Sequence, residues 1–342
     1  MTLLYCDGFD SYATAELNRR YALNASPVID ASVKRNGIGA LALNSFTESI
    51  LWSYGGAITS NKCVVGFAFR CSALPSAAST ILQVAVPGGN YQVKIQLLPA
   101  GNIRFVTAAV VEDSTAQLVI DTWYHIELEF ECANSTASEC YVAIDGVVDI
   151  TVATTSDTQS QAGATIGDIS LESNSIGAAT YYFDDFYVCD QEGSKNNSLL
   201  GDSIVETVLP DGNGYNSDFD GSDGNQVDNF ELVDEATPDD DTTYVEDDTV
   251  DGIDTFTFAA MSGSPITIHG VAVNMQAKKT TENAKQVRNL ARPDSTDYEG
   301  VAHTLSTAYQ NYQDVWEDNP EDDQAWEVAD VDGSEFGVTV EA

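Results

Sequence analysis

The sequence predicts an all-β protein made of two antiparallel β-sandwich, or jelly-roll, domains. Short runs in which apolar and polar residues alternate recur along the chain, as expected for strands with one buried face and one exposed face. Turn-forming residues separate these runs at fairly regular intervals. No long segment has the 3.6-residue period of an amphipathic helix, which argues against an α/β fold.

Residues 1–190 are predicted to form the first domain, and its clearest alternation lies at 123–130. Asp145 and Gly146 form a dipeptide typical of hairpin turns, so the runs before and after it are expected to pair. The other predicted strands of this part are 64–70, 91–97, 102–106, 141–144 and 147–150.

Residues 181–188 are predicted to be the last strand of this sandwich, and they contain two adjacent carboxylates, Asp184 and Asp185. Successive side chains of a strand point to opposite faces. The two carboxylates are therefore predicted to be unable to act together, whereas a glycosidase needs two carboxyl groups that face each other.

The composition changes after residue 190. Residues 191–230 are polar and rich in Gly, Asp and Asn, and they are predicted to be an acidic linker or surface loop. Residues 231–342 are predicted to form a smaller second β-sandwich. Its predicted strands are 254–258, 266–277, 286–292 and 335–340, with 266–277 and 286–292 as a hairpin and 305–316 as a loop or helix.

The charge of the chain excludes several classes of partner. With 54 acidic and 14 basic residues, the net charge is −40 at pH 7. Phosphate contacts need Lys and Arg, so nucleic acid is not expected as a partner. No run approaches the ~20 apolar residues of a membrane span, so no membrane is expected either. The N-terminus lacks the features of a signal peptide, which predicts synthesis in the cytoplasm without export.

One segment partly matches a calcium-binding loop, with Asp218, Asp220 and Ser222 as candidate ligands. Its glycine comes one place late, and Asn229 stands where such a loop has a bidentate Glu. A solvated acidic loop is the alternative, and no other cofactor is expected. The six cysteines form no C-x-x-C pair and there are only three histidines, so a zinc site is not expected.

A cluster of basic residues in the acidic second half is a candidate docking patch for the acidic surface of a partner protein. The alternative is a hairpin whose charges are neutralised locally. The cluster consists of Lys278, Lys279, Lys285, Arg288 and Arg292.

No catalytic residues are predicted, and the protein is expected not to be an enzyme. Glu127, Glu129 and Glu131 share one strand face, but such a row is usually the solvated face of a sandwich. His125 lies on the same face and is expected to be a hydrogen-bonded sheet residue rather than a base. The sequence has no G-x-S-x-G motif and no phosphate-binding glycine loop.

Three segments resemble successive signatures of concanavalin A-like lectin/glucanase (laminin-G-like) jelly rolls: residues 121–130, 141–146 and 183–188. The opening residues 7–12 resemble the first strand of such domains. This resemblance covers roughly residues 1–190 and implies a concanavalin A-like fold for the first domain. The fold hosts many functions, and neither the calcium ligands nor the sugar ligands of the family match residue by residue.

Other segments are similar to tailed-bacteriophage virion proteins of unassigned role: residues 185–190, 196–202, 238–245, 326–328 and 335–338. The similarity implies a structural component of a phage particle. The absence of catalytic constellations, the absence of an export signal and the acidic surface lead us to expect a non-enzymatic protein on the exterior of the virion, as a capsid decoration or a collar or tail appendage. Its partners would be other capsid, collar or tail proteins. A homo-oligomer is expected, with a trimer among the states that suit such a platform. The alternatives are a carbohydrate-binding module that attaches to a host glycan, and a glycoside hydrolase.

Overall fold

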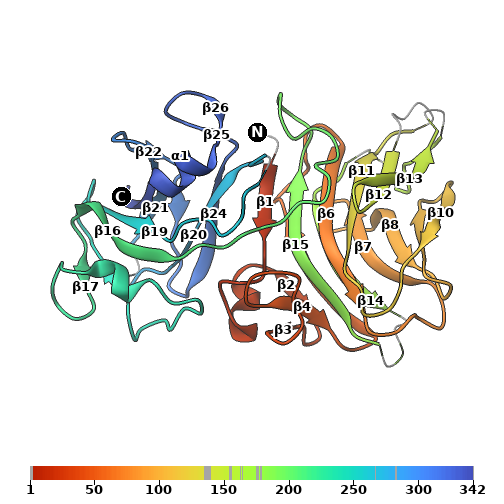
Figure 1. Ribbon diagram of the computed structural model, residues 1–342, viewed down its shortest axis with the longest axis horizontal. Helices are drawn as coiled ribbons and strands as arrows, with labels where there is room; N and C mark the ends of the chain where they lie inside the picture. The colour runs from red at the N-terminus through yellow and green to blue at the C-terminus, as the bar shows by residue number, and fades with distance from the viewer. Residues whose placement is uncertain are drawn as a thin grey trace. The chain divides into compact units, whose positions relative to one another are not determined.

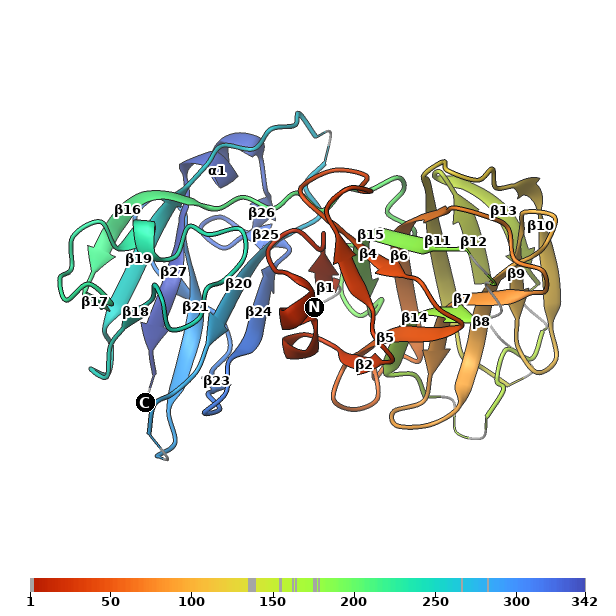
Figure 2. The same cartoon turned by 90° about the horizontal axis from the view of Figure 1, so that it is seen from below.

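The computed structural model describes residues 3–134, 140–153, 156–161, 163, 165–174, 177, 179–265, 267–281 and 283–341. The chain divides into two units, Met1–Val205 and Glu206–Ala342. Each unit consists of antiparallel sheets with a few short helices (Figures 1 and 2), which confirms the predicted fold class. In the described part of the chain, no helix has both the length and the apolar character needed to span a membrane.

The first unit contains two large antiparallel sheets. In the eight-stranded sheet, six strands follow the order β13-β12-β11-β6-β15-β4, β3 pairs with β4, and β1 pairs with β15. These strands are β1 (Leu3–Asp7), β3 (Val28–Asp30), β4 (Ala40–Leu43), β6 (Lys62–Cys71), β11 (Tyr124–Glu131), β12 (Cys140–Ile144), β13 (Val147–Val152) and β15 (Tyr181–Cys189).

The seven-stranded sheet of the same unit has the order β10-β9-β8-β7-β14-β5-β2. Its strands are β2 (Ala22–Asn24), β5 (Thr47–Ser53), β7 (Ser79–Ala85), β8 (Tyr91–Leu97), β9 (Asn102–Val106), β10 (Val111–Gln117) and β14 (Asp168–Asn174). A short 3-10 helix, η1 (Thr14–Arg19), precedes β2.

One hydrophobic core joins the inner faces of the two sheets. Ile126 and Leu128 of β11 and Ile95 of β8 belong to the same buried cluster. The rings of Phe105 and Phe130, one from each sheet, lie 6.4 Å apart between centroids. Each fully buried side chain of this size contributes about 1.5–3 kcal/mol to folding. The six cysteines of this unit are thiols rather than disulfides, and five are buried.

The second unit is built around a six-stranded antiparallel sheet with the order β16-β19-β27-β21-β22, in which β23 also pairs with β21. Its strands are β16 (Pro210–Ser217), β19 (Ile253–Phe258), β21 (Gln286–Arg292), β22 (Tyr298–Glu299), β23 (His303–Thr304) and β27 (Glu335–Val340). Three two-stranded ladders join β17 (Asp220–Gly221) to β18 (Val245–Glu246), β20 (Val271–Ala277) to β24 (Gln310–Trp316), and β25 (Asp318–Asn319) to β26 (Gln324–Ala325). Two short helices are η2 (Asn229–Leu232) and α1 (Val328–Gly333).

The structure differs from the sequence predictions in the organisation of the second half. The division between the units follows Val205 rather than residue 190, and β16 and β17 lie within the predicted linker. The predicted hairpin of 266–277 with 286–292 was wrong, because β20 pairs with β24 and β21 pairs with β27. Residue 266 lies outside the described residues, and 310–316 is a strand rather than a loop or helix.

Candidate functional site

A β-bulge in β15 places two carboxylates on the same side of the eight-stranded sheet. The pairing of β15 with β6 shifts between Asp184 and Tyr187, and Asp185 has a left-handed φ of 52°. Phe183 and Phe186 both point into the core, so the two aspartates between them both face outward. The prediction that they point to opposite faces was wrong, because regular alternation is lost at a bulge.

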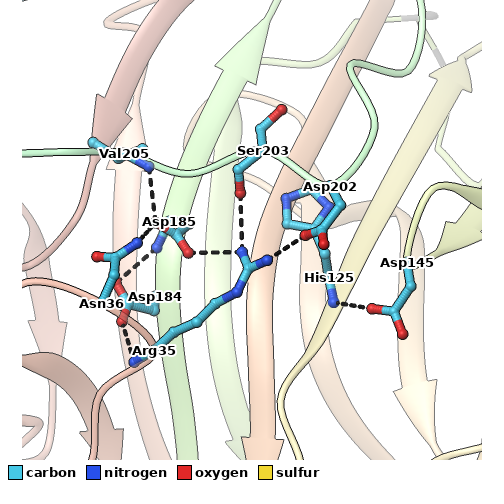
Figure 3. Close-up of polar contacts among 9 residues, drawn as sticks. All are labelled: Arg35, Asn36, His125, Asp145, Asp184, Asp185, Asp202, Ser203 and Val205. Atoms are coloured by element: carbon cyan, nitrogen blue, oxygen red, sulfur yellow. Dashed lines mark hydrogen bonds and ion pairs between the residues drawn. The ribbon is translucent and has the colours of Figure 1, made fainter. Parts of the chain in front are cut away.

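Arg35, in the loop between β3 and β4, binds both carboxylates of the bulge (Figure 3). Its backbone N–H donates to Asp184 Oδ2 at 2.9 Å, and its Nη1 donates to Asp185 Oδ2 at 2.8 Å. Asn36 Nδ2 donates to the other oxygen of Asp185 at 2.8 Å. Both aspartate side chains are fully buried, so these bonds replace the water that the carboxylates lose on folding.

The two carboxylates have different protonation behaviour although they are adjacent. Burial, together with the charge of Asp185, raises the pKa of Asp184 to about 8. Burial also raises the pKa of Asp185, but the N–H of Val205 and the Arg35 guanidinium oppose this rise. At neutral pH, Asp184 is therefore the protonated member of the pair, and Asp185 is the partner of Arg35.

Asp184→Asn is expected to stabilise the first unit increasingly as the pH rises from 6 to 9. The raised pKa means that the stability associated with Asp184 is complete below its unfolded pKa and is lost as the pH rises through the folded pKa. The neutral amide removes this loss, although its NH2 group cannot accept one of the two backbone N–H groups that Asp184 accepts. Relative to wild type, the variant should therefore gain roughly 2–3 kcal/mol between pH 6 and pH 9. Urea unfolding at both pH values checks this. The same difference in stability between Asp184→Asn and wild type at pH 6 and at pH 9 would contradict the prediction.

A segment at the end of the first unit lies across the outer face of the eight-stranded sheet. We call residues 200–205 the strap. The N–H groups of Leu200 and Gly201 donate to Glu127 Oε1 at 2.6 and 3.1 Å. Farther along, Arg35 donates to the carbonyl oxygen of Ser203 at 2.9 Å and also binds the Asp202 carboxylate.

The last contact of the strap returns to the bulge, where the N–H of Val205 donates to Asp185 Oδ1 at 2.8 Å (Figure 3). Arg35 and Asp185 thus hold the strap from the loop and from the sheet. The sequence carries no periodic signal for these polar contacts, because they join residues up to 168 positions apart.

The glutamate row on β11 only partly fits the solvated face that the sequence predicted. Glu129 binds Gln191 at 2.8 Å, and Glu131 forms an ion pair with Lys62 at 3.3 Å. Glu127 is fully buried, and it accepts a hydrogen bond from the Tyr187 hydroxyl at 2.5 Å. Burial raises the pKa of Glu127, so the prediction of a solvated carboxylate was wrong at this position.

His125 lies beneath the strap. Its backbone N–H donates to Asp145 Oδ1 at 2.8 Å, and its carbonyl oxygen accepts the N–H of Asp145 at 2.8 Å. The side chain is 1% exposed, and neither ring nitrogen has a hydrogen-bond partner among the described residues. The ring stacks on Tyr187 with centroids 6.1 Å apart. The expectation of a hydrogen-bonded imidazole was therefore wrong. Burial and the nearby Arg35 lower the pKa of His125 to about 4.

The outer face of the seven-stranded sheet presents a second set of polar side chains. The register places Ser170 of β14 beside Gln83 of β7, and Gln83 beside Lys94 of β8. Ser170 Oγ donates to Glu172 Oε1 at 2.7 Å, and Lys94 Nζ lies 4.0 Å from the centroid of the Tyr91 ring. Burial raises the pKa of Glu172, while the Ser170 hydrogen bond and Lys94 oppose the rise.

These side chains are half-buried, except for Ser170, which is buried. Amide, ammonium, hydroxyl and carboxylate groups therefore lie side by side on neighbouring strands and remain accessible to a ligand. Sequence analysis missed them as a site. The polar positions of 91–97 were visible, but the neighbours of Lys94 come from strands that only the sheet register identifies.

The candidate calcium ligands take part in local backbone contacts of the second unit. Asp218 Oδ2 accepts the N–H of Ile253 at 3.0 Å, and Ser222 Oγ accepts the N–H of Tyr244 at 3.3 Å. Asp220 is exposed on β17. Across the described ranges, no group of three or more His, Cys, Asp or Glu side chains is arranged to hold a metal. The calcium site stays a prediction.

Four of the five residues of the candidate docking patch have partners within the second unit. Lys278 pairs with Asp241, and Lys279 Nζ donates to the carbonyl oxygen of Asn283. Arg288 pairs with Glu341 at 2.7 Å, and Arg292 pairs with Asp297 at 2.5 Å. The remaining residue is Lys285. This arrangement favours the alternative of local neutralisation.

Comparison with known proteins gives likenesses of fold only. No protein-family model matches the sequence, and no curated protein sequence matches it. Among solved structures, endo-β-1,4-glucuronan lyase from the fungus Trichoderma reesei is 13% identical, with 54% of this chain and 94% of that chain covered and a TM-score of 0.43. A Trypanosoma rangeli sialidase is 12% identical, with 45% and 26% covered and a TM-score of 0.36.

The receptor-binding domain of a botulinum neurotoxin of the C/D mosaic serotype is 13% identical, with 51% of this chain and 44% of that chain covered and a TM-score of 0.38. Because a lyase and sialidases are among the similar structures, the prediction that the chain is not an enzyme is contradicted and no longer stands. The similarity assigns neither a reaction nor a substrate to this chain.

Proposed function

We propose that the first unit binds carbohydrate on the outer face of its seven-stranded sheet. The observation that carries this proposal is the row formed by Ser170, Gln83 and Lys94, with Glu172 beside it. Sugar hydroxyls both donate and accept hydrogen bonds. Amide, ammonium and carboxylate groups on adjacent strands suit such a ligand, because each rigid strand fixes the position of its donor or acceptor.

The opposite face of the sandwich is less suited to an external ligand. There Asp184, Asp185 and Glu127 are fully buried, and loop and strap residues already occupy their oxygens. On the seven-stranded sheet, Gln83 and Lys94 stay accessible, and the Tyr91 ring beside Lys94 adds an apolar surface. Aromatic rings with one accessible face pack well against the C–H groups of sugars.

Gln83→Ala and Glu172→Gln are each expected to weaken glycan binding about 10- to 100-fold, because the first removes an amide from the row and the second replaces a charged acceptor by a neutral amide. The full chain is first applied to an array of bacterial surface polysaccharides, and the strongest binder is then titrated by calorimetry. Gln324→Ala, in the second unit, is the matched control and should bind normally. Absence of binding to any glycan would reject the function, whereas unchanged binding by both variants would reject only this location.

The chain length of the bound polysaccharide is followed in the same samples, so that the experiment distinguishes binding from cleavage. Shortening of the polysaccharide by wild type, together with its loss in Glu172→Gln at a polysaccharide concentration that saturates the variant, would make the site catalytic. An unchanged length over the time of the titration would leave binding as the activity of this face.

We further propose that the chain works on the exterior of a bacteriophage particle, together with other virion proteins. The support is the similarity of residues 185–190 and 196–202 to virion proteins and the net charge of −40, which disfavours contact with packaged DNA. Immunogold electron microscopy of purified particles, with an antibody against this chain, should label intact virions. Particles that carry no label would count against this location.

A further inference from the structure

We propose that the strap, residues 200–205, is an acid-sensitive latch that opens when His125 becomes protonated beneath it. Opening would uncover the outer face of the eight-stranded sheet. It would also add six residues, about 20 Å of extended chain, to the connection that leads into the second unit. Such a device would change the reach between the units without unfolding either sandwich.

The contacts of the strap make it a discrete element that can detach. The hydrogen bonds and ion pairs that hold it involve the side chains of Glu127, Arg35 and Asp185. Leu200 also bonds to Tyr187 through its backbone, and Val205 lies against Gly8. Between these contacts the strap is partly exposed, and Ile204 is 60% exposed. A segment held by a few polar contacts opens at a lower free energy than a strand whose side chains pack in the core.

His125 is placed where a proton would disturb these contacts. The imidazole is fully enclosed, neither nitrogen has a hydrogen-bond partner among the described residues, and the ring stacks on Tyr187 (Figure 3 shows it behind Asp202). An imidazolium in this position would need solvent or an acceptor for two N–H groups. Detachment of the strap supplies water.

Charged and titratable groups approach His125 from every neighbouring element. Arg35 comes from the loop between β3 and β4, and its positive charge opposes protonation, whereas Asp202 of the strap favours it but is engaged with Arg35. The remaining groups are Glu127 on the same strand, Tyr187 and Asp184 on β15, and Asp145 in the turn after β12.

The sign of the pH effect follows from the two states of His125. In the closed form its pKa is about 4, and an imidazole in solvent titrates near ~6.5, so between these values only the open form binds the proton. Acidification therefore favours opening, by up to about 300-fold for this pKa difference. Glu127 acts in the opposite direction, because burial raises its pKa in the closed form.

The test isolates His125 by comparing wild type with His125→Phe, which keeps an aromatic ring against Tyr187 and cannot take a proton. Amide hydrogen exchange of residues 200–205 is measured in the full chain between pH 7 and pH 4.5 and corrected for the intrinsic rate. In wild type, protection of the strap should fall at least tenfold more than in His125→Phe. Protection of β6 should not change.

Two further variants complete the experiment. Arg35→Gln should loosen the strap at every pH, and His269→Phe, which removes a histidine from the second unit, should behave like wild type. The same pH dependence in wild type and His125→Phe would overturn the proposal. The proposal would also be overturned if the amides of the strap exchanged only when those of β6 exchanged, because the strap would then open only by unfolding of the whole unit.

Discussion

Asp7→Ala is expected to lower the free energy of unfolding of the first unit by about 3–5 kcal/mol, the cost of breaking a buried charged network. The Asp7 carboxylate is 4% exposed at the end of β1. It accepts the hydroxyls of Tyr12 and Tyr21 at 2.7 Å each, the hydroxyl of Tyr5 at 3.2 Å and the N–H of Phe9 at 2.8 Å. Alanine would leave the first two hydroxyls buried without this acceptor.

The size of this effect depends on burial rather than on charge alone. Asp113→Ala is the matched control, because Asp113 pairs with Arg104 at 2.6 Å on the exposed edge of the other sheet. An exposed ion pair contributes about 0–1 kcal/mol. Urea unfolding of both variants at pH 7, followed by tyrosine and tryptophan fluorescence, gives the comparison. Equal losses in the two variants would show that the tyrosine network has no special role.

The sequence could not show this network, and it also misplaced the strand that carries Asp7, because residues 7–12 resemble the first strand of jelly rolls whereas β1 is Leu3–Asp7. Alternation predicts the strands because it depends on neighbours two positions apart, and β8 and β9 begin and end where alternation places them. The partners of Asp7 meet for another reason. Helix η1 turns the chain back, so that Tyr21 returns to the side of Tyr5, and their hydroxyls lie 2.9 Å apart.

The same limit explains the errors in strand pairing. The run 286–292 was recognised as a strand from its own residues, but its partner β27 lies more than forty residues farther along the chain. Choice of a partner depends on the packing of the whole unit. The small core around Trp326, Phe336 and Ala291 therefore had no counterpart in the local pattern.

The bulge in β15 is a case in which the sequence held an unused signal. Phe183 and Phe186 are three positions apart, whereas two buried residues of a regular strand are separated by two or four. This change of phase marks the position of the extra residue, and Asp185 is one of the residue types that tolerate a positive φ. The partners of the two aspartates, in contrast, come from a loop and a strap that carry no periodic pattern.

Gly66→Ala is expected to destabilise the first unit by about 3 kcal/mol, the upper end of the usual cost of overpacking. A Cβ on Gly66 of β6 would lie 2.2 Å from Cε1 of the Tyr187 ring. The ring cannot move aside freely, because one face stacks on His125 and its hydroxyl donates to Glu127. Gly56→Ala, where nothing lies within 4 Å of the new Cβ, is the control and should cost little.

A double-mutant cycle separates this steric cause from a general intolerance of β6 to alanine. Removal of the ring in Tyr187→Ala opens the space that the Gly66→Ala methyl group needs. The double mutant should therefore lose about 1–3 kcal/mol less stability than the sum of the losses in the two single mutants. Additive losses would mean that the glycine is needed for the backbone of β6 rather than for Tyr187. A double mutant that loses less stability than this sum would show that the ring over Gly66 is a fixed part of the face. That rigidity is what allows a proton on His125 to displace the strap rather than the sheet beneath it.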